Sequence, residues 1–271
     1  MQSTRVDQKS IFLGTHGENY GNWMSNPVFY IVGIGAIVSA ALAAIFFVVT
    51  RIFALGIVCS MITVALVILL CWITWIRRQY SFSGGGMMEQ VHRVVLSHLD
   101  YHGEGTLLEV GCGSGALSIR AALTWPETMV VGVDSWGAIY HYSKELCEKN
   151  AASEGVADRC MFRFGDANKL EFMDECFDAV ISNYVYHNIM GADMQKLLLE
   201  SLRVLKKGGV FAINDDMKPM MYGDMEAFAQ KLRDMGYQEV RLVDTAQAAF
   251  GSRKRAGRLM LGASRLLVGR K

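Results

Sequence analysis

Segments of strand length that alternate with helical segments after residue 86 predict an α/β fold with a doubly wound, mostly parallel sheet. Two further observations shape this prediction. A glycine-rich turn follows the first apolar strand, at residues 111–115. Residues 27–76 are almost wholly apolar apart from Arg51, so a transmembrane helical hairpin is predicted to precede the sheet.

The apolar segment 27–76 is too long to cross a bilayer once. As one helix it would be about 75 Å long, against a hydrocarbon core of ~30 Å. Arg51 in mid-membrane would cost roughly 2.5–3.5 kcal/mol, whereas at an interfacial turn it costs little. We therefore expect spans near Val28–Val49 and Ile52–Ile76, with a buried hairpin of a soluble protein as the alternative. A signal peptide does not fit, because the first run begins late and a second follows at once.

Flanking charges predict that both termini and the α/β domain are cytoplasmic. Arg5 and Lys9 precede the first span, and Arg77 and Arg78 follow the second, whereas Arg51 stands alone at the turn. Basic residues favour the cytoplasmic side of a membrane. The expected partner of the hairpin is the lipid bilayer, and a homo-oligomer through the hairpin is compatible with the sequence.

Four segments follow from this division. They are a cytosolic N-terminal segment (1–26), the transmembrane hairpin (27–78), a glycine-containing linker (79–86) and the α/β domain (87–271). About 185 residues remain after the anchor, which is enough for one α/β core. Tyr20 and Trp23 either sit at the membrane interface or belong to a lid over a bound ligand.

The net charge of +1 argues neither for nor against nucleic acid. The six cysteines lack metal or disulfide spacing, so we expect them to be reduced and mostly structural. A basic run at residues 253–258 is typical of a solvated face, and near a bilayer it would also suit anionic headgroups.

The elements of the α/β domain are expected in a regular order. Helices are predicted at Met87–Leu99, Met194–Val204 and Met225–Met235, with shorter helices between the early strands. Strands are predicted at Thr106–Val110, Met129–Val133, Met161–Phe164, Ala179–Ser182, Val210–Asn214, Glu239–Asp244 and Ser264–Gly269.

The turn after the first strand predicts a nucleoside site. Gly111, Gly113 and Gly115 let the backbone approach a ligand, a helix follows, and Asp134 ends the next strand where an acid can bind ribose hydroxyls. Glycines that only make a turn are the alternative. A dinucleotide is also permitted by the spacing, but Glu109 would crowd a pyrophosphate and favours a cationic group such as the ammonium of a methionine moiety.

From Met87 to Lys271 the chain resembles the class I S-adenosylmethionine-dependent methyltransferases, with a motif pattern like that of the ubiquinone/menaquinone methyltransferases. GDANKLEFMDECFDAVISN (residues 165–183) is similar to that family's GDA-x-x-LPF-x-D-x-SFD-x-V segment, with Glu171 in place of the usual proline. ESLRVLKKGGVFAIND (residues 200–215) is similar to its helix and LK-x-GG turn. The resemblance implies a seven-stranded Rossmann-like sheet with one antiparallel strand in the final pair, and S-adenosyl-L-methionine as the cofactor.

The resemblance also implies roles for individual residues. The three glycines would lie against the methionine and ribose, Asp134 would bind the ribose diol, and Trp136 would pack on adenine. Asp166 would accept from the adenine amino group beside the Ala167 amide, although it suits a turn cap equally, and Trp136 suits a core position. The expected cofactor-binding residues are Glu109, Gly111, Gly113, Gly115, Asp134, Trp136, Asp166, Ala167 and Asn183.

Methyl transfer needs a nucleophile, methyl carbon and sulfur in line, with water excluded. The segment after the fourth strand is expected to face the reacting methyl group. His187 is the candidate general base because its ordinary pKa lies near physiological pH. Tyr184 and Tyr186 would line the pocket or orient the acceptor. A capping His187 and aromatic residues that only pack are the alternatives.

Two classes of chemistry are not expected. Asn183 is followed by no proline pair, so the (D/N)PP(Y/F) signature of nucleobase amine methyltransferases is missing and no nucleic acid partner is expected. A metal would need acids at the ends of the fourth and fifth strands. Asn214, Asp215 and Asp216 supply one set, but the fourth strand supplies none, so these acids are expected to be solvated or to contact a polar substrate head.

The sequence thus predicts a membrane-anchored methyltransferase whose acceptor is hydrophobic or membrane-associated, such as a lipid or quinone. A small soluble amine, thiol or phenol as acceptor is one alternative. A membrane sensor that binds the cofactor without turnover is another. The acceptor atom, the oligomeric state and the need for a general base stay open.

Overall fold

The computed structural model describes residues 7, 11, 13–24, 26–82, 86–137 and 142–271, and the chain divides into two compact units. One unit contains the hairpin, Gly21–Gly86. The other contains Met1–Tyr20, Met87–Trp136 and Tyr142–Lys271, and we call it the sheet unit. The basic residues Arg5 and Lys9 and linker residues 83–85 lie outside the described residues.

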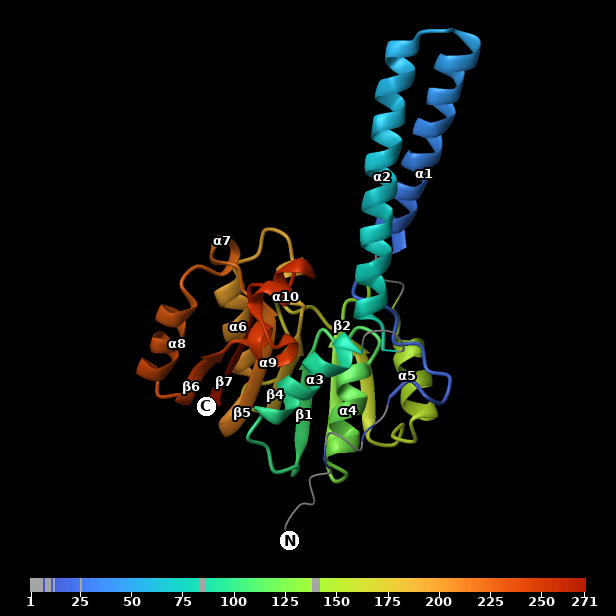
Figure 1. The fold of residues 1–271 in the computed structure, drawn as a ribbon. Coiled ribbons are helices and arrows are strands. Elements are labelled where there is room, and N and C mark those ends of the chain that lie inside the picture. Colours follow the sequence, from blue (N-terminus) through green and yellow to red (C-terminus); the bar gives the residue numbers. More distant parts are fainter. Residues whose placement is uncertain (1–6, 8–10, 12, 25, 83–85, 138–141) are drawn as a thin grey trace. The chain divides into compact units, whose positions relative to one another are not determined.

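The hairpin consists of two antiparallel helices that lie side by side (Figure 1). Helix α1 (Asn26–Ala44) continues into a π-helical turn, η2 (Ile45–Val49), and α2 spans Phe53–Tyr80. Arg51 lies in the turn between them with a φ of 53°, as its position in the sequence predicts. Helix α2 ends later than the predicted span, so Arg77, Arg78 and the first two residues of the expected linker are helical.

Most of the apolar side chains of the hairpin are exposed, among them Ile31 at 69% and Met61 at 68%. A contiguous exposed apolar surface is rare on soluble monomers. By length and composition, both helices are able to cross a membrane. These exposures argue against the buried soluble hairpin. The buried residues of the two helices are Ala36, Ser39, Ala43, Gly56, Ile73, Ile76 and Tyr80.

The sheet unit is built on one seven-stranded sheet in the order β3-β2-β1-β4-β5-β7-β6. Strands β1 to β5 are parallel, and β7 is antiparallel to both β5 and β6. This confirms the predicted fold, including the antiparallel strand. The strands are β1 (Thr106–Val110), β2 (Met129–Asp134), β3 (Cys160–Phe164), β4 (Phe177–Asn183), β5 (Leu205–Asp216), β6 (Gln238–Val243) and β7 (Ser264–Arg270).

Helices lie on both sides of the sheet (Figure 1). Covered on both faces, the central strands carry nearly continuous apolar runs, and Leu108, Val180 and Ile213 are fully buried. The helices are α3 (Met87–Ser97), α4 (Ala116–Thr124), α5 (Lys144–Ser153), the 3₁₀ turn η3 (Tyr186–Asn188), α6 (Met194–Arg203), α7 (Pro219–Tyr222), α8 (Met225–Asp234), α9 (Thr245–Phe250) and α10 (Arg253–Arg258).

Among the differences from the sequence prediction are one strand and two short helices of this unit. Strand β5 is much longer than the expected Val210–Asn214, because its first residue pairs with β4 and its last with β7. Helices α9 and α10 were not predicted, since six residues are too few to show a helical period. Their N-cap residues, Asp244 and Ser252, were the available signal, and both side chains accept a backbone N–H.

The polypeptide reverses its direction of progress across the sheet between β1 and β4. Strands β2 and β3 lie on one side of β1, and β4 and β5 lie on the other. In open α/β sheets, ligands bind outside the carboxyl ends of the strands at this point. The glycine turn after β1 and the segment after β4 both lie there.

Candidate cofactor and active site

The glycine turn joins the ends of β1 and β2. The Gly111 N–H donates to the Val133 carbonyl at 2.7 Å, and the Cys112 N–H donates to the same oxygen at 3.0 Å. A Cβ added at Gly111 would lie 2.1 Å from the Val185 side chain. Gly115 caps helix α4 in the left-handed region, with a φ of 81°. These positions require glycine, so the turn is set by both backbone conformation and packing.

Asp134 holds the same turn from the end of β2. Its carboxylate accepts the Gly113 N–H at 2.8 Å and the Trp136 N–H at 2.7 Å. The Trp136 indole N–H donates to the Gly113 carbonyl at 2.9 Å. Burial raises the pKa of Asp134, and the backbone hydrogen bonds oppose that rise. The structure therefore brings together Gly113, Asp134 and Trp136, three of the predicted cofactor residues.

Glu109 is buried beneath this turn and accepts a short hydrogen bond from the Ser118 hydroxyl. Burial raises the pKa of Glu109 to about 8, although the Ser118 hydrogen bond lowers it. A buried carboxyl group is costly to ionise without a positive charge nearby, so this position favours a cationic ligand group. Ser118 was not identified from the sequence, although it lies one helical turn into α4.

Asp166 and Ala167 follow β3, next to the end of β2. The Gly165 N–H donates to the Asp134 carbonyl at 3.0 Å, which places this turn beside Asp134. The Asp166 side chain is exposed and accepts both the N–H and the side-chain amide of Asn168, at 2.9 and 2.8 Å. It therefore caps its own turn, and Ala167 packs against the edge of the core.

His187 pairs with a buried acid. Its Nδ1 makes a short hydrogen bond with Asp215, which is fully buried at the end of β5. Asp215 also accepts the backbone N–H groups of Tyr186 at 2.8 Å and Asp216 at 2.6 Å. Burial alone lowers the pKa of His187, but the hydrogen bond and charge of Asp215 outweigh it, and the net direction is upward.

The expectation that Asp215 and Asp216 are solvated is wrong, because both are buried. The two carboxylate oxygens of Asp215 form hydrogen bonds with the backbone of η3 and with the His187 ring. Asp216 pairs with Lys218 at 2.6 Å. Strand β5 continues two residues beyond Asn214, and this extension places both acids inside the sheet edge.

The other predicted residues of this segment point in different directions. Tyr184 has a φ of 55°, its hydroxyl lies 2.8 Å from Ser264 Oγ, and its ring is edge-on to His187 at 6.2 Å. Tyr186 is fully buried, and its hydroxyl lies 2.8 Å from Ser201 Oγ. Tyr184 thus lies beside His187, whereas Tyr186 belongs to the core. Asn183 accepts the side-chain amide of Asn214 at 2.8 Å.

The N-terminal segment contacts the glycine turn, which the sequence did not establish. The Ser114 hydroxyl donates to the Tyr20 carbonyl at 3.0 Å. The Asn150 amide donates to the carbonyls of Asn19 and Ser114, both at 3.0 Å. Tyr20 is buried in the sheet unit, whereas Trp23 belongs to the hairpin unit, where its ring packs on Tyr80.

A glycine turn at the switch point of a doubly wound sheet, with an acid on the next strand, defines a nucleoside-cofactor enzyme fold. Residues 102–249 match the family model described as methyltransferase domain, which is more than half of the chain. The chain therefore belongs to this family of methyltransferase domains.

Known relatives agree with this assignment. The chain is 31% identical over 137 residues to 27-O-demethylrifamycin SV methyltransferase of Amycolatopsis mediterranei, covering 51% of this chain and 48% of the relative. It is 31% identical over 135 residues to demethylmenaquinone methyltransferase of Symbiobacterium thermophilum, covering 49% and 51%. The chain spans about half the length of these relatives.

Solved structures share the fold. Geranyl diphosphate C-methyltransferase of Streptomyces coelicolor A3(2), with S-adenosyl-L-homocysteine, superposes with a TM-score of 0.55 at 15% identity, covering 72% of this chain and 80% of that one. A geranyl diphosphate methyltransferase in complex with S-adenosylmethionine gives 0.52 at 18% identity, covering 69% and 91%. At these identities the likeness concerns the fold alone.

Replacing Asp215 by asparagine should lower the pKa of His187, because the variant loses the charge that outweighs burial. Because the pKa of His187 is raised in the folded state, its pairing with Asp215 stabilises the fold. This stabilisation is fully present below the unfolded-state pKa of histidine and is lost as pH rises through the folded-state value. Nuclear magnetic resonance of ¹⁵N-histidine-labelled protein measures this titration, with His187→Gln to assign the signal. The exposed N-cap variant Asp224→Asn is the control, and an unchanged His187 titration in Asp215→Asn would rule out the pairing.

Proposed function

We propose that this chain is a membrane-anchored methyltransferase that acts on a hydrophobic or membrane-associated acceptor, such as a lipid or a quinone-like molecule. The observation that carries the proposal is an exposed apolar hairpin in the same chain as a methyltransferase domain. An anchor raises the effective concentration of the enzyme toward acceptors that partition into the bilayer. Two relatives are named for hydrophobic substrates, demethylmenaquinone and sterol.

Exposed methionines near the carboxyl ends of β4 and β5 support an apolar acceptor. Met190 follows η3 and is 97% exposed, and Met220 in α7 is 98% exposed. Met221 is exposed beside it. Methionine is flexible and polarisable, so such side chains adapt to apolar partners of different shapes. We infer that the acceptor enters over this edge of the sheet, close to His187.

The cofactor is proposed to lie along the glycine turn. The backbone can approach the cofactor at Gly111, Gly113 and Gly115. Burial raises the pKa of Glu109, and the positive ammonium of the methionine moiety would favour its ionised form. Asp134 retains lone pairs for the ribose diol while it holds the turn. Trp136, Asp166 and Ala167 would surround the adenine, and Asn183 would close the site from the end of β4.

The bound cofactor supplies an electrophilic methyl group, and the chain supplies alignment and a base. Because His187 Nδ1 faces Asp215, its Nε2 is the atom proposed to take a proton from a hydroxyl, thiol or acidic carbon of the acceptor. The Asp215 carboxylate stabilises the imidazolium that results. Only neutral His187 acts as a base, so the rate is expected to fall as pH drops through its raised pKa. Tyr184 orients the ring or the acceptor from beside it.

Transfer of a labelled methyl group into fractionated membrane extract tests this function directly. We expect the label in the lipid-soluble fraction, and a label confined to small soluble amines, thiols or phenols would refute the acceptor class.

His187→Ala should lower kcat by about 10²–10⁴-fold while cofactor affinity changes little, since general bases contribute on that scale. Tyr186→Phe, a core change, should keep near-normal turnover. Normal turnover in His187→Ala would remove the base from the mechanism.

Cofactor affinity should depend on Asp134. Loss of a charged hydrogen-bonding partner costs about 1.5–3 kcal/mol, so Asp134→Ala should weaken S-adenosylmethionine binding tenfold or more. Calorimetry measures the affinity, and thermal unfolding shows whether the variant keeps its fold. The exposed acid variant Asp158→Ala is the control. Equal affinities in a folded Asp134→Ala would overturn the ribose assignment.

We also propose the segment boundaries and the orientation of the chain: a cytosolic segment of residues 1–26, the hairpin of 27–78, the linker of 79–86 and the methyltransferase domain of 87–271, with both termini cytoplasmic. Single cysteines at positions 51 and 78, in a chain without its own cysteines, would report the two ends of the hairpin. An impermeant thiol reagent on intact cells should label position 51 and spare position 78. The opposite pattern would reverse the orientation.

A further inference from the structure

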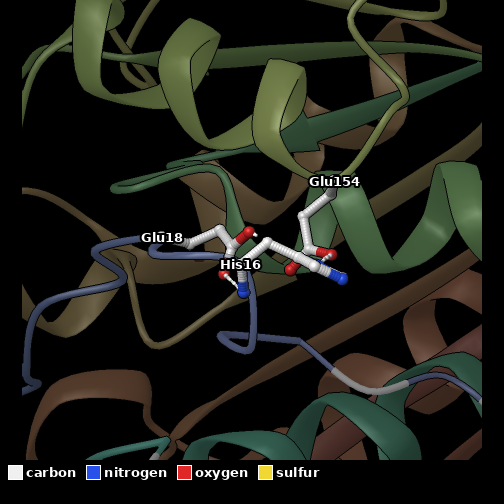
Figure 2. Close-up of side chains that lie close together, drawn as sticks. All are labelled: His16, Glu18 and Glu154. Atoms are coloured by element: carbon white, nitrogen blue, oxygen red, sulfur yellow. Dashed lines mark hydrogen bonds and ion pairs between the residues drawn. The ribbon is translucent and has the colours of Figure 1, made fainter.

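The N-terminal segment closes on the C-terminal end of α5 around one carboxylate. Glu154, the C-cap residue of α5, accepts the Gly14 N–H at 3.1 Å and the Tyr20 hydroxyl at 3.0 Å, both at Oε1. These contacts leave Oε2 of Glu154 facing the ring of His16. Figure 2 shows His16, Glu18 and Glu154 gathered at this point.

The three side chains form a compact set of nitrogen and oxygen atoms. His16 Nδ1 lies 3.6 Å from Glu18 Oε1 and 3.4 Å from Glu154 Oε2. One atom from each residue lies within 4.8 Å of the other two. All three residues belong to the sheet unit. No part of the proposed methyl-transfer site uses them.

Burial makes this arrangement costly without a cation. The Glu18 side chain is 0% exposed and that of Glu154 is 3% exposed. Glu18 Oε2 accepts the backbone N–H of His16 at 2.8 Å, but Glu18 Oε1 accepts no hydrogen bond from any residue that the structure describes. Among those residues, His16 is the only ion-pair partner of either acid. Two buried carboxylates carry more negative charge than one histidine can neutralise, so a bound cation would stabilise them.

We propose that His16, Glu18 and Glu154 bind a divalent transition-metal ion, with Zn²⁺ the best fit. Zinc bonds to nitrogen and oxygen are about 2.0–2.2 Å, which sets tetrahedral ligand atoms about 3.4 Å apart. Both distances from His16 Nδ1 lie close to that value. A histidine in the set favours zinc over the hard cations that prefer oxygen alone. The fourth ligand is water, since the His16 side chain is 63% exposed.

The metal ties residues 14–20 to α5, and this has a consequence for the cofactor. The Tyr20 carbonyl at the end of this segment accepts the Ser114 hydroxyl in the glycine turn. Asn150 of α5 bonds both Asn19 and Ser114. A cation at Glu154 therefore orders a segment that contacts the cofactor turn. The role is structural, and it is independent of the identity of the acceptor.

The test is a Zn²⁺ titration by calorimetry of the full chain in detergent after chelator treatment and removal of the chelator. We expect one Zn²⁺ per chain with wild-type protein. His16→Ala, Glu18→Gln and Glu154→Gln should each weaken binding at least tenfold, because even outer-shell changes at metal sites cost about 10–100-fold. The exposed variants His102→Ala and Glu127→Gln are matched controls and should bind as wild type does.

Hydrogen exchange of the same samples locates the ion. Zn²⁺ should slow exchange at the Gly14 amide and its neighbours in wild-type protein, and the effect should vanish in His16→Ala. Co²⁺ in place of Zn²⁺ should show no thiolate charge-transfer band, which excludes the cysteines as ligands. Binding that is absent in wild type, or equal in the three ligand variants and the controls, would overturn the proposal.

Discussion

The hydrogen bond between the Asp134 carboxylate and the Gly113 N–H is the contact on which the site depends. It ties the end of β2 to the turn after β1 at the point where the order of the sheet reverses. The second carboxylate oxygen fixes Trp136 through its backbone N–H. One acid therefore sets the shape of the turn and presents the residues proposed for ribose and adenine.

A buried acid, Asp215, organises the other half of the proposed site. Asp215 lies at the end of β5 and accepts N–H groups from Tyr186 and Asp216 while it holds the ring of His187. A buried carboxylate is tolerated only when donors surround it, and η3 supplies these donors. Because Nδ1 of His187 bonds Asp215, Nε2 is the ring nitrogen that remains for the acceptor in the proposed mechanism. The same pairing raises the pKa of His187. Carboxylates on two strands thus order the proposed cofactor half and the proposed acceptor half separately.

The sheet and its glycine turn were predictable because their signals are local. Parallel strands buried on both faces read as continuous apolar runs, and only glycine fits at Gly111 and Gly115. The partner of His187 was not predictable, because Asp215 is 28 residues away and becomes adjacent only when β4 pairs with β5. Whether Tyr184 or Tyr186 faces the site depends on the 3₁₀ turn, which has no sequence signature here.

The N-terminal segment shows the same limit. The sequence leaves the same two alternatives for Tyr20 and Trp23, a membrane interface or a lid, yet they belong to different units, and Tyr20 contacts the glycine turn from more than 90 residues away. Asp166 shows the converse: the turn after β3 is local and predictable, but its carboxylate binds Asn168 and stays exposed. Long-range pairing therefore determines which of the predicted side chains share a site.

A structure of the full chain bound to S-adenosyl-L-homocysteine tests the central claim most directly. We expect that the Asp134 carboxylate accepts both ribose hydroxyls while it keeps the Gly113 N–H, and that the homocysteine ammonium lies near Glu109. A ribose bound by another acid, or a turn that releases Asp134 when the ligand binds, would contradict it.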